Sequence, residues 1–488
     1  MNEPIRRLSA VVLLLFFTLM AAGSWVQFVK AKQLGDDPRN VRTLYKQFGS
    51  FRGPIIVDGQ AIVSSVPIDD PFNYQRTYTD GPLYAAITGY YSIGPGRSGL
   101  EASENSLLDG SADALFWTRL GELVAGTQQQ GASVELTINA AAQKAAFDAL
   151  GNRRGAVVAI NPRTGAILAM VSTPSYDPAT LAVHSSADAN RVYQSLLSDQ
   201  TNPLINRAIG GDTYPPGSTF KLVVAAAALQ AGYSPDTLID APQELSLPLT
   251  TATLKNYGGE SCGPTGKITL LEALRISCNT AFAKLAMDLG WPAIESMAAN
   301  FGWGSGLNIP LGVTPSRLPV SPNQPEVAQS AIGQFDVRAT PLQMAMVAAA
   351  IANHGVLMKP YLVNKVRDPD LRVIEQTTPE KLSTPMSPDA AAALTVMMQA
   401  VVKNGTGTRA QIDGVSVAGK TGTAETGLHT PPHTWFVAFA PAENPTVAVA
   451  VLVENGGDIG SEATGGAVAA PIAKAVIEAV LANAAGGN

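Results

Sequence analysis

A long run without charged residues, from Leu8 to Val29, constrains this chain more than any other feature of its sequence. At about 1.5 Å per residue it forms a helix of about 33 Å, close to the thickness of the hydrocarbon core of a bilayer. Arg6 and Arg7 precede the run, and Trp25 lies near one end, where interfacial aromatic residues are common. We therefore expect one transmembrane helix over residues 8–29.

The short positively charged segment before this helix sets its expected orientation. The positive-inside rule places residues 1–7 in the cytoplasm and everything after residue 30 outside the cell membrane. A cleaved signal peptide is the competing interpretation, because Ala21-Ala22-Gly23 loosely fits a cleavage site. The apolar run continues past that site to Val29, which favours a retained anchor; the body is exported on either interpretation.

Length and composition predict a folded chain of more than one domain. The chain has 488 residues, of which 46% are hydrophobic, and its formal net charge is −6. This charge offers no field that would attract nucleic acid, so we expect no nucleic-acid partner.

Changes of pattern along the chain predict three parts. Residues 1–30 form the cytoplasmic tip and the anchor, and residues 31–152 form a small pedestal domain without a catalytic cluster, in which Asp58-Gly59 between two apolar runs predicts a hairpin. A strong hairpin at 155–171 opens the second core, over residues 153–488, with helices at 222–230, 270–289, 341–353 and 467–485 and a strand at 447–453. Strands at both ends of this segment and helices between them predict an α+β domain.

Ser218 and Lys221 form the first catalytic candidate. Pro216-Gly217 ends a loop, and Ser218-Thr219-Phe220-Lys221 opens an apolar helix, so the serine and the lysine lie one turn apart on the same face. A lysine desolvated there can lose its proton and serve as the base that a serine nucleophile needs. Alone the pattern is weak, because Ser218 could simply cap the helix.

Two further motifs in a fixed order strengthen this interpretation. Ser277-Cys278-Asn279 lies within the predicted helix 270–289, and Lys420-Thr421-Gly422-Thr423 lies on a predicted strand. Together with Ser218 they form the motif set of penicillin-binding proteins and serine β-lactamases. Taken separately, Ser277 and Asn279 would be interpreted as ordinary polar residues of a helix, and residues 420–423 as a turn.

The chemistry that these residues can supply is complete. Ser277 can relay a proton between Lys221 and a leaving amine, and Asn279 can hold a substrate amide. Lys420, Thr421 and Thr423 can bind a substrate carboxylate, while Gly419 and Gly422 are expected to leave room for the substrate backbone beside the strand. The backbone N–H groups of Ser218 and Thr423 are the expected oxyanion hole.

Over nearly its whole length the chain resembles the class B penicillin-binding proteins, most of all their actinobacterial and mycobacterial members with a short membrane-proximal domain. Beyond the three motifs, the resemblance rests on Arg52-Gly53-Pro54-Ile55, Gly99-Leu100-Glu101, residues 155–176, Ile332-Gly333-Gln334, residues 402–408 and Trp435-Phe436. In two departures, Cys278 replaces the Asp of S-D-N, and Phe335 stands where many relatives have glycine.

This resemblance implies a penicillin-binding protein/serine β-lactamase-like transpeptidase domain and cross-linking of peptidoglycan stem peptides in growth or division. The implied donor is a nascent or lipid-linked stem peptide ending in D-Ala-D-Ala, and β-lactam antibiotics are the implied covalent inhibitors. A membrane glycan polymerase of the SEDS family is the implied partner, and no cofactor is implied.

Other functions use similar residues. A D,D-carboxypeptidase or a β-lactamase shares the motifs, but no local sequence identifies the deacylating Glu of class A β-lactamases. A non-catalytic β-lactam sensor would need a cytoplasmic signalling part, and residues 1–7 are too short for one. His429 and His433 have metal-like spacing, but Pro431 and Pro432 between them forbid a helix, so we expect no metal site.

Cys262 and Cys278 are expected to form a disulfide, because the exported compartment is oxidising and no metal motif competes for the two thiols. Cys262 lies in a glycine-rich loop, and Cys278 lies on the predicted helix 270–289. The bridge would fix that loop beside the catalytic helix. The alternative, in which Cys278 is a small buried hydrophobe and Cys262 is free, stays open at this point.

Overall fold

The structure is a computed structural model, and it describes residues 3–30, 48–427 and 430–486. Its N-terminal segment is the helix α1 (Glu3–Ser24), which continues into a π-helical turn, η1 (Trp25–Val29). The segment has a mean hydropathy of 2.1 and buries no side chain, so it is long and apolar enough to cross a membrane. The C-terminal helix α17 (Gly465–Gly486) is also long and apolar, but it packs in the protein core.

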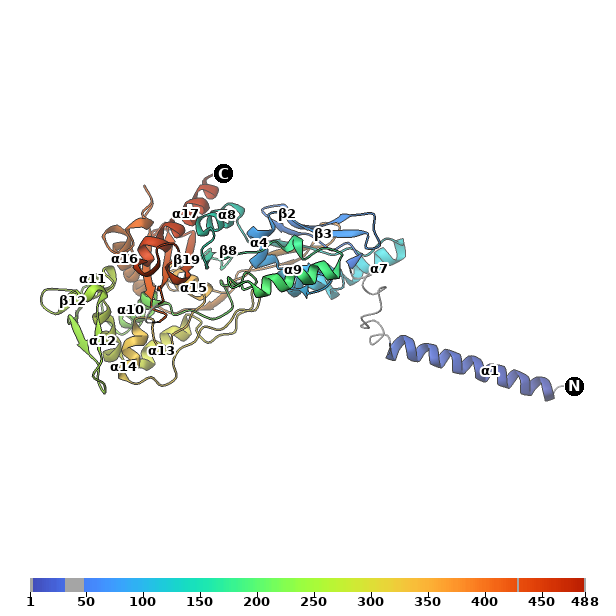
Figure 1. The fold of residues 1–488 in the computed structure, drawn as a ribbon, viewed down its shortest axis with the longest axis horizontal. Coiled ribbons are helices and arrows are strands. Elements are labelled where there is room, and N and C mark those ends of the chain that lie inside the picture. Colours follow the sequence, from blue (N-terminus) through green and yellow to red (C-terminus); the bar gives the residue numbers. More distant parts are fainter. Residues whose placement is uncertain (1–2, 31–47, 428–429, 487–488) are drawn as a thin grey trace.

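The catalytic candidates lie around a five-stranded antiparallel sheet with strand order β17-β18-β19-β7-β8. Its strands are β7 (Gly155–Ile160), β8 (Ile167–Thr173), β17 (Ala418–Ala424), β18 (His433–Ala440) and β19 (Val447–Val453). The helices α8 (Ala140–Leu150) and α17 pack on one face, and α15 (Pro341–Ala352) packs on the other (Figure 1). Burial on both faces explains why β19 reads as an unbroken apolar run.

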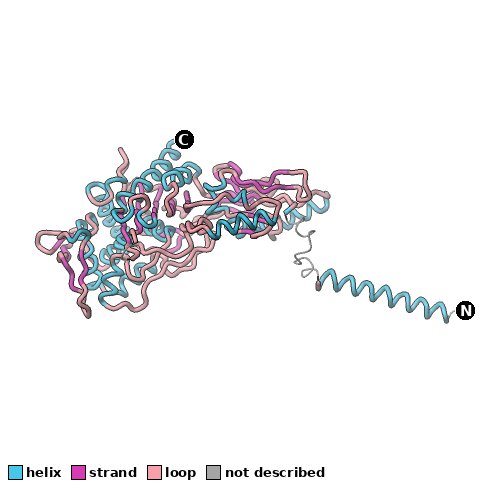
Figure 2. The backbone as a smooth tube through the Cα atoms, in the orientation of Figure 1, coloured by secondary structure: helices cyan, strands magenta, loops and turns pink. Residues whose placement is uncertain are grey.

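A mainly helical lobe lies beside the β17 end of the sheet (Figure 2). Its helices are α10 (Lys221–Gln230), α11 (Leu270–Arg275), α12 (Asn279–Leu289), α13 (Trp291–Asn300), α14 (Gln324–Ala331) and α16 (Pro388–Asn404). Its short strands are β9 (Leu238–Asp240), β10 (Glu244–Ser246), β11 (Thr253–Lys255), β12 (Lys267–Thr269), β13 (Leu357–Met358) and β16 (Lys381–Ser383).

The pedestal contains a six-stranded sheet of order β15-β14-β6-β1-β2-β3. Its strands are β1 (Ile55–Val57), β2 (Gln60–Pro67), β3 (Tyr74–Tyr78), β6 (Ser133–Leu136), β14 (Val363–Arg367) and β15 (Val373–Gln376). Asp58 and Gly59 have φ values of 47° and 76°, as the predicted tight hairpin between β1 and β2 requires. Strands β14 and β15 come from the segment expected to belong wholly to the catalytic domain. A single boundary near residue 153 therefore does not place every strand of this sheet in the pedestal.

Short helices and strands complete the pedestal, and α9 returns to it from the catalytic side of the boundary (Figure 1). These elements are α4 (Gly81–Thr88), β4 (Tyr91–Ser92), β5 (Gly96–Arg97), α5 (Gly99–Ser103), α6 (Asn105–Leu108), α7 (Phe116–Ala125) and α9 (Ser186–Ser198).

A buried ion cluster explains two of the pedestal motifs. The Glu101 carboxylate accepts from Arg52 Nε at 2.5 Å and from Arg76 Nε at 2.7 Å, and all three side chains are buried. Burial acts to raise the pKa of Glu101, but the two guanidinium groups outweigh it and lower that pKa. The cluster joins the segment before β1 to β3 and α5, so its main effect is on the packing of the pedestal.

Candidate active site

Ser218 lies in a tightly held turn between the sheet and the helical lobe. A 3-10 turn, η4 (Gly217–Phe220), contains the serine and leads directly into α10, as the sequence predicts. The turn is fixed from outside: Gly217 N–H donates to the Gly333 carbonyl at 3.0 Å, and Trp435 Nε1 donates to the Pro215 carbonyl at 3.0 Å. Ser218 itself stays partly exposed, so a substrate can reach its hydroxyl.

Lys221 is fully buried one turn after Ser218. Its Nζ donates to the Ser277 carbonyl and to Asn279 Oδ1, each at 2.7 Å, and lies 3.2 Å from Ser277 Oγ. Burial lowers the pKa of Lys221 well below its ordinary value, and the neighbouring Lys420 lowers it further. Burial therefore favours the neutral form of the amine beside the nucleophile turn, which is the form that the base role requires.

The loop that contains Ser277 differs from the prediction. The expected helix 270–289 is wrong, because it is two helices, α11 and α12, and Ser277 between them has a φ of 62°. Ser277 N–H donates to the Leu274 carbonyl, and Cys278 N–H donates to the Ala273 carbonyl, the pattern of a Schellman cap that usually contains glycine. This break turns the Ser277 hydroxyl and the Asn279 amide toward Lys221.

Lys420 completes the cluster from strand β17. Its Nζ is 2.9 Å from Ser277 Oγ and 2.9 Å from the Thr421 carbonyl, so the Ser277 hydroxyl lies between two lysines. Burial lowers the pKa of Lys420 to about 7. The structure thus brings together the three motifs, which lie up to about 200 residues apart in the sequence.

The glycines of β17 lie against the protein's own chain. A Cβ at Gly422 would lie 2.9 Å from Thr219 Cγ2 and 3.0 Å from the Pro216 carbonyl oxygen, and one at Gly419 would lie 2.7 Å from the Phe436 ring. These positions therefore make room for the protein's own chain, and the approach of a substrate backbone to this strand stays a prediction. On the other side, a Cβ at Gly217 would lie 2.6 Å from the Thr423 carbonyl, which shows how closely the strand approaches the nucleophile turn.

Several residues that support the site were not assigned a role from the sequence. Asn256 Oδ1 accepts from the backbone N–H groups of Asn279 and Thr280 at 2.9 and 3.0 Å and so caps α12. Thr406 Oγ1 lies 2.6 Å from Thr421 Oγ1. No local pattern links these partners, since Asn256 is remote in sequence from the helix that it caps.

Gln334 and Phe335 follow the glycine that contacts Gly217. The Gln334 amide pairs with the Glu425 backbone: its oxygen accepts the N–H at 2.8 Å and its nitrogen donates to the carbonyl at 3.3 Å. Phe335 has a φ of 59°, a conformation that favours glycine. The segment Ile332-Gly333-Gln334 therefore holds the end of β17.

A disulfide joins Cys262 to Cys278, with 6.0 Å between the Cα atoms. This is the predicted pairing, although Cys278 lies at the start of α12 and not within a helix. It fixes the 257–266 loop beside the Ser277 turn.

Of the two histidines with metal-like spacing, His429 lies outside the described residues. His433 Nδ1 accepts a hydrogen bond from the Asn455 N–H at 3.1 Å, so this ring nitrogen is engaged with the backbone.

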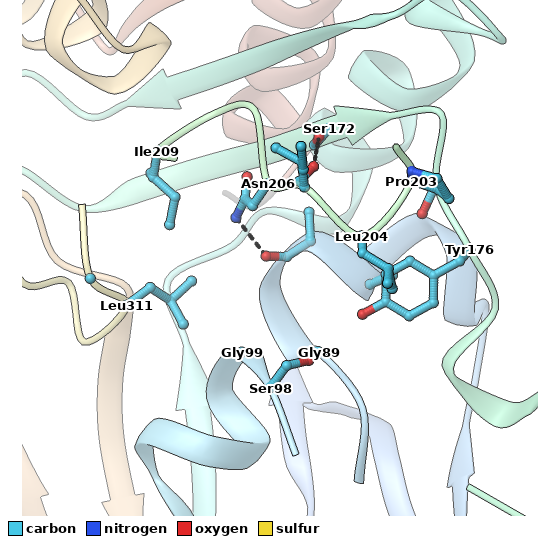
Figure 3. Close-up of a pocket in the computed structure, with 15 residues that line it drawn as sticks. Gly89, Ser98, Gly99, Ser172, Tyr176, Pro203, Leu204, Asn206, Ile209 and Leu311 are labelled. Atoms are coloured by element: carbon cyan, nitrogen blue, oxygen red, sulfur yellow. Dashed lines mark hydrogen bonds between the residues drawn. The ribbon is translucent and has the colours of Figure 1, made fainter. Parts of the chain in front are cut away.

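A cavity of about 230 Å³ lies away from this cluster, between the pedestal and the catalytic domain (Figure 3). Tyr176, Leu204, Ile209 and Leu311 line it, and Asn206 Nδ2 donates across it to the Ala86 carbonyl at 2.7 Å. None of the three catalytic motifs contributes to its wall, so the cavity is not the catalytic site.

An antiparallel sheet and a helical lobe hold a serine and two buried lysines of lowered pKa, with a second serine between the lysines. These features define an active-site-serine acyl-transferase of the penicillin-binding type. Residues 155–478 match the family model for the penicillin binding protein transpeptidase domain, and residues 52–134 match the penicillin binding protein A dimerisation domain. The chain belongs to the penicillin-binding protein transpeptidase family.

Relatives and solved structures agree with this assignment. The chain is 46% identical to the peptidoglycan D,D-transpeptidase PbpA of Mycolicibacterium smegmatis and 44% identical to that of Mycobacterium tuberculosis, with 99% of each chain covered. The M. tuberculosis penicillin-binding protein A, solved as a ceftriaxone acyl-enzyme, has a TM-score of 0.87 at 45% identity and covers 90% of this chain and 100% of its own. Pseudomonas aeruginosa PBP2 has a TM-score of 0.74 at 30% identity and covers 88% of this chain and 95% of its own. The expected likeness to the mycobacterial members of the family is confirmed.

Proposed function

We propose that this chain is a peptidoglycan D,D-transpeptidase that forms its acyl-enzyme on Ser218. The observation that supports this most directly is the Ser277 hydroxyl, which lies 3.2 Å from Lys221 Nζ and 2.9 Å from Lys420 Nζ. Two buried amines with lowered pKa values and a shared hydroxyl form a path along which protons can move beside a serine nucleophile.

In the proposed reaction, Ser218 Oγ attacks the carbonyl of the D-Ala-D-Ala bond while Lys221 takes the hydroxyl proton. The N–H groups of Ser218 and Thr423 stabilise the oxyanion, and Ser277 passes the proton to the amine of the departing D-Ala. An acceptor amine then attacks the Ser218 ester, forms the cross-link and restores the serine. A β-lactam follows the first half of this path, but its leaving amine stays attached to the acyl group.

Binding of the donor is assigned to β17. Lys420 carries a positive charge part of the time near neutral pH, since burial lowers its pKa to about 7, and it faces the same hydroxyl as Lys221. With the hydroxyls of Thr421 and Thr423 it would hold the terminal carboxylate of the peptide. Gly422 contributes through the close approach of its strand to the Ser218 turn.

We further propose that residues 1–30 form the cytoplasmic tip and membrane anchor. Residues 31–152, together with strands β14 and β15, form the pedestal. The remainder forms the catalytic domain outside the membrane. The long apolar α1–η1 segment supports the anchor. A lipid-linked or nascent stem peptide as donor, and a SEDS-family polymerase as partner, follow from the family resemblance.

Incubation of the full chain with benzylpenicillin, followed by intact mass spectrometry, tests the acyl-enzyme. We expect one adduct, located on the peptide that contains Ser218, that persists for many minutes and is absent in Ser218→Ala. Adduct formed at the normal rate in Ser218→Ala would refute the nucleophile, and rapid penicillin turnover without adduct would favour a β-lactamase.

Nascent peptidoglycan strands separate transfer from hydrolysis. Cross-linked peptide dimers in the digested product support a transpeptidase, whereas trimmed monomers alone would identify a D,D-carboxypeptidase. A protein that is acylated but yields neither product would be a sensor.

A further inference from the structure

In helix α7 (Phe116–Ala125) the large apolar side chains face outward, whereas an ordinary surface helix turns them toward the protein. None of its residues is buried, and its large apolar side chains are exposed: Trp117 and Leu123 are each 77% exposed and Val124 is 84% exposed. With Phe116 and Leu120 these side chains cover an arc of about 120°, which is one continuous face.

The polar face of α7 is turned toward the pedestal. Arg119 Nη1 donates to the Ser111 carbonyl at 2.7 Å, and the Glu122 carboxylate accepts from the Gln130 N–H at 3.3 Å. The pedestal therefore holds the helix by its polar side and presents its apolar side outward.

This face lies at the end of the pedestal where the chain from the anchor enters. The segment after α7 runs beside Phe51: Gly131 N–H donates to the Phe51 carbonyl at 3.1 Å, and Gln130 pairs with the same residue. Figure 1 shows α7 at the end of the body nearest α1. Only residues 30–50 separate the anchor from Phe51, a span of at most about 75 Å when fully extended.

We propose that the apolar face of α7 rests in the outer interface of the lipid bilayer that holds the anchor. An amphipathic helix with a tryptophan on its apolar face is the structure that binds at this depth. The contact would fix the pedestal on the membrane, so the catalytic domain would stand at a set height above it. The inference rests on the proposed topology, in which residues 8–29 span that bilayer.

Photo-cross-linking of the full chain in phosphatidylcholine and phosphatidylglycerol vesicles tests this contact. p-Benzoylphenylalanine replaces Trp117 in one protein, Leu15 within the anchor in a second, and Leu249, which is 90% exposed in the catalytic domain, in a third. Intact mass spectrometry after irradiation should show lipid adducts at positions 117 and 15 and none at 249.

A lipid adduct at position 15 without one at 117 would overturn the inference and leave the anchor in place. A cross-link from 117 to a second copy of the chain would overturn it in favour of a dimer contact. Absence of adduct at both positions would overturn the inference together with the topology, while penicillin labelling of Ser218 in all three proteins reports the catalytic proposal separately.

The double variant Leu123→Ser/Val124→Ser, carrying the probe at 117, provides a second measurement. Because both side chains are exposed, the fold should persist, and the yield of lipid adduct should fall about 10-fold. Val320→Ser, at a 92% exposed apolar position in the catalytic domain, is the matched control and should leave the yield unchanged. An unchanged yield in the double variant would contradict a lipid contact through this face.

Discussion

At the scale of single residues, the site depends on two lysines that are fully buried without a carboxylate partner in the contacts described. Burial of each amine favours its neutral form, and the neighbouring Lys420 further disfavours a charge on Lys221. This arrangement favours the base form of the lysines, and the burial that does so costs stability, as is common at functional sites.

Lys221→Ala should lower the second-order rate of penicillin acylation by about 10²-fold or more, because the variant lacks the base that takes the Ser218 proton. Stopped-time labelling with a fluorescent penicillin measures this rate. Lys284→Ala, on the partly exposed face of α12, is the control and should react normally. Normal acylation in Lys221→Ala would assign the base role to another group.

Lys420→Met should stabilise the protein more at pH 6 than at pH 9. The pKa of Lys420 is lowered to about 7 by burial, so the unfolded chain binds more protons than the folded chain between about pH 7 and 10. Stability of the natural protein therefore rises with pH through that window, and below it the folded state carries a buried charge that methionine removes.

The expected rise in melting temperature at pH 6 is about 2–5 °C, measured by scanning calorimetry. Lys144→Met, at an exposed position of α8, is the control and should show no such pH dependence. An equal effect of Lys420→Met at both pH values would contradict a lowered pKa at this site.

At the scale of elements, the site is formed where a turn, a broken helix and an edge strand approach closely. Gly333 lies against the backbone of Gly217, where a Cβ would collide with the carbonyl oxygen, and Gly422 lies against Pro216 and Thr219. The position of the nucleophile is therefore set by backbone contacts that only glycine permits.

Gly333→Ala should displace the Ser218 turn and lower the acylation rate by about 10²-fold, since a shift of about 1 Å is enough to misalign the reacting atoms. The labelled-penicillin assay measures this loss. Gly306→Ala, at a position with open space around it and an ordinary φ, should leave the rate unchanged. If both variants react alike, the contact with Gly217 does not position the serine.

At the scale of the whole molecule, the segment after residue 153 supplies two strands, β14 and β15, to the sheet of the pedestal. Strand β14 pairs with β6, so residues 363–376 stabilise a sheet whose other strands lie before residue 137. A cut at the predicted boundary would leave β14 and β15 without their neighbour and would expose an unpaired edge.

A fragment of residues 153–488 should therefore be less stable and more prone to association than a fragment of residues 48–488. Urea unfolding and size-exclusion chromatography of the two fragments measure the difference. A monomeric 153–488 fragment with an unchanged urea midpoint would show that the shared sheet contributes nothing to the catalytic domain.

By itself, the sequence determined the chemistry of this protein and the elements whose signals are local. The residue types and order of Ser218, Lys221, Ser277, Asn279 and Lys420 indicate the reaction, and the β1–β2 hairpin, the β7–β8 hairpin and α10 follow from turn residues and periodicity.

Only the tertiary structure decided how those elements meet. The break at Ser277, the transfer of β14 and β15 to the pedestal and the outward apolar face of α7 carry no local signal. The sequence of residues 270–289 predicts one continuous helix. In the fold, Lys221 binds the Ser277 carbonyl and Asn256 binds the Asn279 N–H, so these backbone groups pair outside a helix. The physical reason is that the free energy of folding depends on burial and hydrogen bonding throughout the chain. Contacts between remote segments can therefore override the local preference of a segment.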